Sequence, residues 1–202
     1  MKNMETNQKN YRKEHLLLRN TMTTEEVQQK SCAIVKKLLD SDWYKGAEEI
    51  FLYYPLGTEV DCKTLMMQAV HDGKKLALPR TASDFCMDFY YIKSFGQLAE
   101  GAFHVMEPKE ECKKAVPCEQ IVLTPGVVFG RDGSRYGYGK GYYDRFFARY
   151  PKLKKYGICY ENQLEQTLFT DVYDVKMERI YTESQVIEIT GKDSHYGIIG
   201  DL

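Results

Sequence analysis

Apolar residues recur along the chain at two spacings, one typical of amphipathic helices and the other typical of short buried strands. Residues 23–26, Thr-Thr-Glu-Glu, match the capping box with which many helices begin. Behind this box the apolar side chains between 27 and 39 recur every three or four residues, so a helix is expected there. Further helices are predicted at 9–19, where the sequence is basic, at 61–71 and at 139–150.

Short apolar runs, bounded by proline, glycine or charged residues, are typical of buried strands. They lie at 50–54, 76–79, 87–92, 121–123, 156–160 and 184–189. Strands that alternate with helices favour an α/β fold, so we predict a three-layer α/β/α sandwich around a mostly parallel, Rossmann-like sheet, with residues 1–202 as one domain. Such sheets bind ligands beyond the carboxyl ends of their strands, and the candidate loops are therefore 55–61, 79–84 and 125–140.

Composition and charge narrow the classes of function. The 202 residues carry 28 Lys and Arg against 29 Asp and Glu, so the net charge is −1, and 43% of the residues are hydrophobic. A globular core is therefore expected, whereas a non-specific nucleic-acid binder would need a basic surplus. No apolar run approaches the roughly 20 residues of a membrane span, and residues 1–20 lack the apolar core of a signal peptide. We expect a cytoplasmic protein without nucleic-acid or membrane partners.

Cysteine and tyrosine usage adds two observations. The six cysteines form no Cys-x-x-Cys pair, so reduced thiols are expected and a zinc site is not. Tyrosine is abundant, with 16 residues against 9 Phe and 1 Trp. Five of the tyrosines lie between 136 and 150, where their flat faces and polar edges could bind an aromatic ligand.

The segment 126–145 combines glycines with cations between a predicted strand and a predicted helix. Gly137, Gly139 and Gly141 leave a stretch of backbone without side chains, so its amide N–H groups can approach an anion. Arg135 and Lys140 place two cations beside this stretch. A surface turn would explain the glycines alone, but the flanking strand, the cations and the helix start favour anion binding.

Two well-known nucleotide-binding motifs do not match this segment. A Walker P-loop ending at Lys140 would need glycine and then serine or threonine where the chain has Ser134 and Gly141. A dinucleotide fingerprint starting at Gly137 would need a third glycine where Tyr142 stands. Asp144 follows in the first turn of the predicted helix, where a carboxylate either complements the helix dipole or binds Mg²⁺.

The same segment resembles the 5-formyltetrahydrofolate cyclo-ligase family, also called methenyltetrahydrofolate synthetases. The resemblance is carried by Pro125-Gly126, Phe129 and the stretch 133–145, Gly-Ser-Arg-Tyr-Gly-Tyr-Gly-Lys-Gly-Tyr-Tyr-Asp-Arg. It extends over most of the chain and includes Arg12, the loop 54–61, residues 78–80, Glu107-Pro108 and Asp174.

The resemblance implies an ATP- and Mg²⁺-dependent cyclo-ligase that converts 5-formyltetrahydrofolate, possibly polyglutamylated, into 5,10-methenyltetrahydrofolate, with release of ADP and phosphate. The γ-phosphate is transferred to the formyl oxygen, and N10 then attacks the formyl carbon. We expect a monomer that acts on this small molecule. Two alternatives stay open, namely another nucleotide-dependent phosphotransferase or ligase, and a non-catalytic folate- or nucleotide-binding protein.

The resemblance also implies roles for individual residues. The catalytic group would be Lys140, Arg135 and Tyr138. The ATP contacts would be Lys9, Arg12, Arg135, Gly137, Tyr138, Gly139, Lys140, Gly141, Tyr142 and Tyr143. The folate contacts would be Leu52, Glu59, Tyr138, Gly139, Lys140, Gly141 and Tyr142, and the Mg²⁺ ligands Asp144 and Asp174. From the residues alone, Leu52 could equally be core, Glu59 a charge on a loop rim and Asp174 a solvated loop carboxylate.

Four positions depart from the family pattern, namely Gln8, Gly130, Tyr136 and Tyr138. Gln8 stands where many members have a lysine four residues before the N-terminal arginine, and Lys9 follows directly. Tyr138 stands where some members have arginine. If that arginine assists the transition state, we expect Lys140 or Arg131 to provide the charge in this chain.

Overall fold

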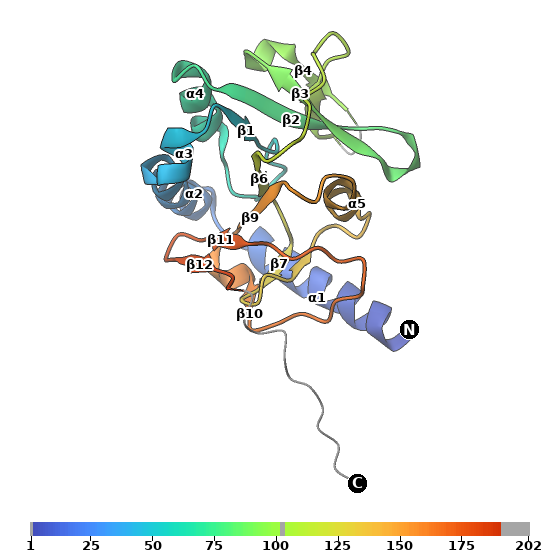
Figure 1. The fold of residues 1–202 in the computed structure, drawn as a ribbon. Coiled ribbons are helices and arrows are strands. Elements are labelled where there is room, and N and C mark those ends of the chain that lie inside the picture. Colours follow the sequence, from blue (N-terminus) through green and yellow to red (C-terminus); the bar gives the residue numbers. More distant parts are fainter. Residues whose placement is uncertain (1, 102–103, 191–202) are drawn as a thin grey trace.

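Seven strands form the central sheet of the computed structural model, which describes residues 2–101 and 104–190 (Figure 1). In spatial order they are β12 (Val186–Glu188), β11 (Arg179–Tyr181), β9 (Lys154–Ile158), β6 (Ile121–Thr124), β1 (Glu49–Phe51), β2 (Lys75–Thr81) and β3 (Met87–Ile92). The strands from β11 to β2 pair in parallel, while β12 and β3 run antiparallel to their neighbours at the two edges. The prediction of a mostly parallel sheet is confirmed.

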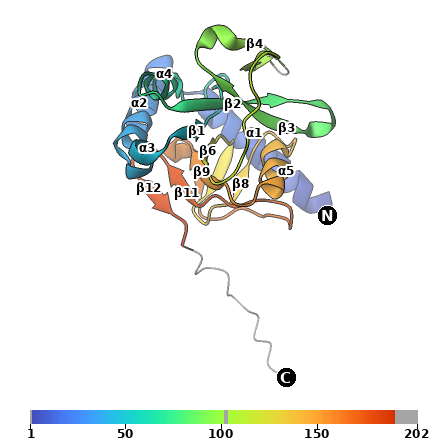
Figure 2. The ribbon, with the colours of Figure 1, turned by 45° about the horizontal axis from the view of Figure 1, so that its top comes forward.

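Helices cover both faces of this sheet (Figure 2). One face carries α2 (Thr24–Asp40), α3 (Asp42–Gly46) and α4 (Lys63–His71), and the other carries α5 (Tyr142–Arg149). The longest helix, α1 (Lys2–Asn20), includes the predicted basic helix and packs against β7 and a 3₁₀ turn at Glu161–Gln163. The predicted three layers are therefore present.

Successive residues of the central strands point into opposite cores. In β1, Ile50 packs with the side chains of α2 and α4, whereas Phe51 packs with α5. The same alternation separates Leu123 from Val122 in β6. Because both faces are covered, an unbroken apolar run is the pattern that such strands require. This is why the short runs in the sequence identified the central strands.

Several short elements were not predicted. They are α3, β11, the small sheet of β10 (Leu164–Glu165), β7 (Val128–Gly130) and β8 (Arg135–Tyr136), the hairpin of β4 (Leu98–Glu100) and β5 (Met106–Pro108), and the 3₁₀ turns at Ser83–Phe85 and Phe95–Gln97. Most span two or three residues, too few for a hydrophobic period to be recognised. The predicted boundaries also change, since the 139–150 helix begins only at Tyr142 and the 50–54 strand ends at Phe51.

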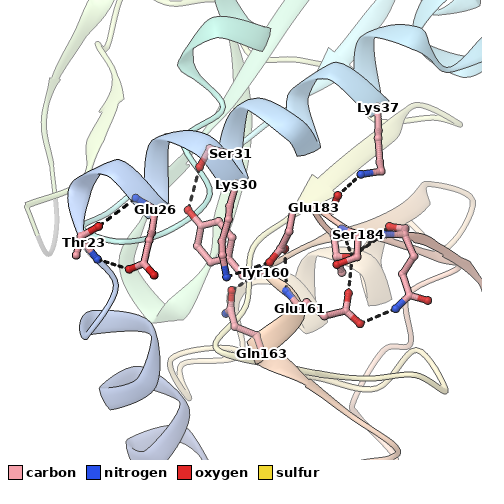
Figure 3. A network of polar contacts seen from close by, with 12 residues as sticks. Thr23, Glu26, Lys30, Ser31, Lys37, Tyr160, Glu161, Gln163, Glu183 and Ser184 are labelled. Carbon is pink, nitrogen blue, oxygen red and sulfur yellow. Dashed lines mark hydrogen bonds and ion pairs between the residues drawn. The ribbon is translucent and has the colours of Figure 1, made fainter.

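A polar network fixes α2 against the carboxyl end of the sheet (Figure 3). The predicted capping box is confirmed, because the Glu26 amide donates to Thr23 Oγ1 at 3.2 Å and the Thr23 amide donates to Glu26 Oε2 at 2.8 Å. Ser31 and the hydroxyl of Tyr160 lie 2.9 Å apart, and Lys30 pairs with Glu183 at 3.1 Å. The helix is thereby held to the segments that follow β9 and β11.

Phe129 of β7 is enclosed by two glycines from different segments. A Cβ atom at Gly126 or at Gly157 of β9 would lie 2.6 Å from the Phe129 ring. Neither position can therefore take a larger residue while the ring stays in place. The contact holds the segment that follows β6 against β9.

Two sequence-based expectations concern the membrane and the cysteines. Within the described ranges, no helix combines the length and the apolar character needed to cross a membrane. The six cysteines carry free thiols, three of them buried.

Leu123→Ala tests the core on the α2 side of the sheet. Leu123 is completely buried, so the truncation should lower the free energy of unfolding by about 2–5 kcal/mol in urea titrations. Val116→Ala is the control, because Val116 is 75% exposed and its truncation should cost less than about 0.5 kcal/mol. Equal midpoints for the two variants would contradict the described packing.

Candidate active site

The Gly-rich loop, residues 137–141, connects β8 to α5 at the carboxyl end of the sheet. Gly139 and Gly141 have φ angles of 86° and 65°, a left-handed conformation that glycine adopts without strain. A Cβ at Gly137 would lie 2.8 Å from Arg135 Nη1, so this glycine makes room for the guanidinium. The loop ends at the first turn of α5, whose N–H groups have no partners within the helix. The glycine conformations suit such a loop, and anion binding by it stays a prediction.

Arg135 is buried beneath this loop and holds Asp144. Its Nη2 lies 3.2 Å from both carboxylate oxygens of Asp144, and its Nη1 donates to the Pro125 carbonyl at 3.4 Å. The guanidinium lies over the Tyr143 ring at 5.5 Å, and Nε is buried without a hydrogen-bond partner. A predicted ATP contact and a predicted Mg²⁺ ligand are thus neighbours that pair with each other in this structure.

Asp174 lies beside this pair. The amide of the next residue, Val175, donates to Asp144 Oδ1 at 3.3 Å, and Asp174 itself accepts from the Asp171 amide at 2.9 Å. Burial raises the pKa of Asp174, and the negative charges of Asp171 and Asp144 add to this shift. In the described part of the chain no three His, Cys, Asp or Glu residues form a metal-binding group. Two carboxylates still suit Mg²⁺, which takes its other ligands from phosphates and water.

Glu59 comes from the loop after β1 and reaches the Gly-rich loop. Its carboxylate accepts hydrogen bonds from the Leu56 amide at 2.9 Å and from the Tyr138 hydroxyl at 3.0 Å. Glu59 is only 5% exposed, so it is not a charge on a loop rim. Burial raises the pKa of its carboxyl group, although the Leu56 amide, Arg19 and Tyr138 lower it. The predicted folate contacts Glu59 and Tyr138 are thereby brought together.

Arg19 of α1 is a site residue that the sequence reasoning missed. It is 3% exposed, and its Nη2 donates to the Tyr138 hydroxyl at 2.8 Å. Arg131 pairs with Glu161 at 2.9 Å, and the expectation that Lys140 or Arg131 provides charge to the transition state stays a prediction. The signal in the sequence is the spacing of Arg12, His15 and Arg19 on one face of the helix, while Leu17 and Leu18 are exposed.

The N-terminal contacts of the loop come from Arg12. Its Nε donates to the Gly137 carbonyl at 3.0 Å, and its guanidinium lies over the Tyr136 ring at 5.1 Å. Lys9 is exposed on the same helix, and Gln8 donates to the Phe169 carbonyl at 3.2 Å. Arg12 therefore lies against the Gly-rich loop, while the contact of Lys9 with ATP stays a prediction.

Lys140 and Tyr142 face the turn between β2 and β3. The Lys140 ammonium is exposed and lies 5.6 Å from the centre of the Phe85 ring, and the Tyr142 ring lies 6.2 Å from the same ring. Leu52 is completely buried in the core on the α2 and α4 side, so its place beside a folate stays a prediction. The structure thus confirms only that Leu52 is a core residue.

Two hollows elsewhere on the molecule do not coincide with the candidate site. Two hollows of about 620 and 480 Å³ lie at the opposite end of the sheet, around Lys75 and Glu49 at the starts of β2 and β1. None of the predicted site residues lines either of them. Ligands of parallel sheets usually bind beyond the carboxyl ends of the strands. The predicted site lies at that end of the sheet, whereas the two hollows lie at the opposite end.

Glu59→Gln should change how stability depends on pH. Because burial raises the pKa of Glu59, the folded protein keeps this proton at pH values where the unfolded chain has lost it. The stability that Glu59 contributes therefore falls as pH rises from the ordinary value of 4.5 through the higher pKa of the folded protein. In urea titrations, the unfolding free energy of the variant minus that of wild type should rise across this window and then level off. A difference that does not vary with pH would contradict the prediction.

Comparisons with known proteins identify the family of this chain. The model of the 5-formyltetrahydrofolate cyclo-ligase family matches residues 4–183. A probable 5-formyltetrahydrofolate cyclo-ligase of Caenorhabditis elegans is 26% identical over 181 residues, which cover 82% of this chain and 87% of that protein. The 5-formyltetrahydrofolate cyclo-ligase of Escherichia coli is 24% identical over 84% of this chain and 97% of its own length.

A solved structure extends the similarity to the whole fold. The 5,10-methenyltetrahydrofolate synthetase of Aquifex aeolicus superimposes with a TM-score of 0.81 and is 30% identical, covering 95% of this chain and 97% of that one. The match runs through both loops that meet at Tyr138 and Glu59, since the family model spans them entirely. With sequence and fold in agreement over nearly the full length, this chain belongs to the 5-formyltetrahydrofolate cyclo-ligase family.

Proposed function

We propose that this chain catalyses the ATP-dependent cyclisation of 5-formyltetrahydrofolate to 5,10-methenyltetrahydrofolate. The observation that carries the proposal is the 3.0 Å contact between the Tyr138 hydroxyl and Glu59. It joins the Gly-rich loop, which is suited to a triphosphate, to a buried carboxylate that is suited to a pterin. Phosphoryl donor and acceptor would then meet at one place, as transfer between them requires.

The nucleotide side of the site consists of cations and amides. Arg12, Arg135 and Lys140 surround the backbone of residues 137–141, and phosphoryl transfer depends mainly on such positioning and charge stabilisation. Lys9, Tyr142 and Tyr143 complete the proposed ATP contacts. Lys140 is exposed and free to turn from Phe85 toward a bound phosphate, because its side chain has four rotatable bonds.

Asp144 and Asp174 would hold Mg²⁺ with the phosphates. The ion would neutralise part of the triphosphate charge. Asp144 forms an ion pair with Arg135. When Mg²⁺ and ATP are bound, Asp144 would turn toward the ion and Arg135 toward a phosphate. The two carboxylates fit this role because they lie close together and one has a raised pKa caused by burial and by nearby negative charges.

The folate side consists of Glu59 and the residues of the Gly-rich loop from 138 to 142. The Glu59 carboxylate can accept the amino and ring N–H groups of a pterin, and the Tyr138 ring, with the residue 48% exposed, presents a face beside it. Leu52, which directly follows β1, is proposed as a second contact that becomes accessible only if its surroundings move. These residues would hold N10 and the formyl group in line with the γ-phosphate.

The proposed reaction has two steps. The formyl oxygen attacks the γ-phosphorus and ADP leaves. N10 then bonds to the formyl carbon and loses its proton, the carbon–oxygen bond breaks and phosphate leaves. The catalytic task of Lys140, Arg135 and Tyr138 is to stabilise the charge that moves between these oxygens. We further propose that the protein works as a cytoplasmic monomer and accepts polyglutamylated substrate.

The decisive experiment follows methenyl absorbance in the purified full-length protein. With 5-formyltetrahydrofolate, ATP and Mg²⁺, absorbance should grow with one ADP released per product, and omission of ATP should abolish it. ADP release only with other acceptors would favour another phosphotransferase or ligase. Tight binding of 5-formyltetrahydrofolate without ADP would favour a non-catalytic binding protein.

Lys140→Ala should weaken catalysis without affecting the fold. The loss of one charged contact to phosphate is expected to lower kcat/KM for ATP by about 10- to 100-fold. Lys152→Ala, which removes an exposed lysine after α5, should behave as wild type. Kinetics of Lys140→Ala that match those of Lys152→Ala would remove Lys140 from the site.

Asp144→Asn should raise the Mg²⁺ concentration needed for half-maximal rate, because a neutral amide is a weaker ligand than a carboxylate. Titration of Mg²⁺ at saturating ATP measures this shift. Asp40→Asn, at the exposed end of α2, serves as the control. Overlaid titration curves for Asp144→Asn and wild type would mean that Asp144 only complements the α5 dipole.

A further inference from the structure

The inward face of α1 is polar where amphipathic helices are usually apolar. Arg12, His15 and Arg19 lie on the side that packs against the rest of the protein, whereas Leu17 and Leu18 are 65% and 51% exposed. A buried arginine costs free energy unless every donor group finds a partner. Arg19 is 3% exposed, so its contacts explain why this inverted pattern is tolerated.

Arg19 joins three segments that are distant in sequence. Its Nε donates to Thr58 Oγ1 at 3.2 Å, in the loop after β1. Its Nη1 donates to the Gly126 carbonyl at 3.4 Å, after the end of β6, and its Nη2 donates to the Tyr138 hydroxyl at 2.8 Å, in the Gly-rich loop. One guanidinium thus holds together the loops that make the proposed site.

In the contact between Arg19 and Tyr138, Arg19 is the donor and the Tyr138 hydroxyl is the acceptor. The Tyr138 oxygen accepts from Arg19, so its own hydrogen is free to point to Glu59, 3.0 Å away. Hydrogen bonds that follow one another in this way strengthen each other in a low-dielectric environment. The guanidinium also lies 5.9 Å from the centre of the Tyr138 ring. Arg19 therefore acts on both the hydroxyl and the ring of this residue.

We propose that Arg19 is the positioning residue of the folate half of the site, setting Glu59 and Tyr138 in the arrangement that receives the pterin of 5-formyltetrahydrofolate. The proposal rests on the proposed function and deepens it. Tyr138 is also a proposed ATP contact, but Arg19 makes no hydrogen bond within the described residues to the proposed phosphate-binding cations Arg12, Arg135 and Lys140. Its removal should therefore affect the folate far more than ATP.

The protonation of Glu59 distinguishes a positioning role of Arg19 from simple structural support. The groups that face Glu59 are Arg19 from α1, Tyr138 from the Gly-rich loop, Tyr143 from α5, and Tyr53 and Cys62 on either side of its own loop. Arg19 is the cation in this set, and its charge favours the ionised carboxylate. Without that charge, the carboxylate should take up its proton at a higher pH.

The experiment uses Arg19→Met and Arg19→Lys in the full-length protein, with Lys13→Met on the exposed side of α1 as the control. Thermal melting first defines a temperature at which every variant is folded. Arg19→Met should lower kcat/KM for 5-formyltetrahydrofolate by about 10- to 100-fold, because a charge-assisted hydrogen bond is lost, and should change kcat/KM for ATP by less than about 3-fold.

The pH dependence of kcat/KM gives the second readout. The acidic limb should move to higher pH in Arg19→Met and stay near the wild-type position in Arg19→Lys, which keeps the charge. Tyr138→Phe should lower kcat/KM for 5-formyltetrahydrofolate by a smaller factor in the Arg19→Met background than in wild type, since the two residues act together. The proposal is wrong if Arg19→Met lowers kcat/KM equally for both substrates and the acidic limb of the pH profile stays in place. Arg19 would then only support the fold.

Equilibrium binding keeps this test distinct from that of the overall reaction. Titration of 5-formyltetrahydrofolate without ATP should show weaker binding to Arg19→Met than to wild type and Lys13→Met. If wild type binds the folate but forms no methenyl product, the proposed reaction is wrong. The difference in folate affinity between Arg19→Met and wild type then tests the role of Arg19 by itself. If wild type binds no folate, both proposals are wrong.

Discussion

The parallel pairing of β1 with β6 is the constraint on which the site depends. Ile50 pairs with Ile121 and Phe51 with Val122, so the two strands end side by side at the same edge of the sheet. Their following loops consequently leave the sheet next to each other. This is how Glu59, after β1, meets Tyr138 across 79 positions of sequence. If this register moved, the proposed nucleotide and folate halves would separate.

Three charged side chains are buried at this edge. Glu59, Arg19 and Arg135 are each 5% exposed or less, and each finds a partner within the protein. Such pairs contribute little net stability, since desolvation offsets much of their attraction. What they provide is a fixed arrangement of charge, which lowers the reorganisation that ligand binding would otherwise require.

Sequence reasoning predicted the parts of this structure that follow from a repeated pattern. The apolar runs identified β1, β2, β6 and β9, because strands covered on both faces must be apolar throughout. The glycine spacing identified the loop before α5, because Gly139 and Gly141 adopt positive φ. Arg19 was missed, since the spacing of Arg12, His15 and Arg19 on one helix face does not show that a side chain is buried. Its burial depends on partners from three distant segments. Lys140 could be placed in the loop, but not the direction of its flexible side chain.

The enclosure of Phe129 has a consequence for how this chain can vary over evolutionary time. The ring occupies the space that side chains at positions 126 and 157 would need. A larger residue at either glycine becomes acceptable only after the aromatic residue is replaced by a smaller one, and that intermediate leaves a void. The three positions are therefore expected to change in a set order or not at all. The Gly126 carbonyl also accepts a hydrogen bond from Arg19. A change at position 126 would therefore affect both the packing around Phe129 and the charges of the site.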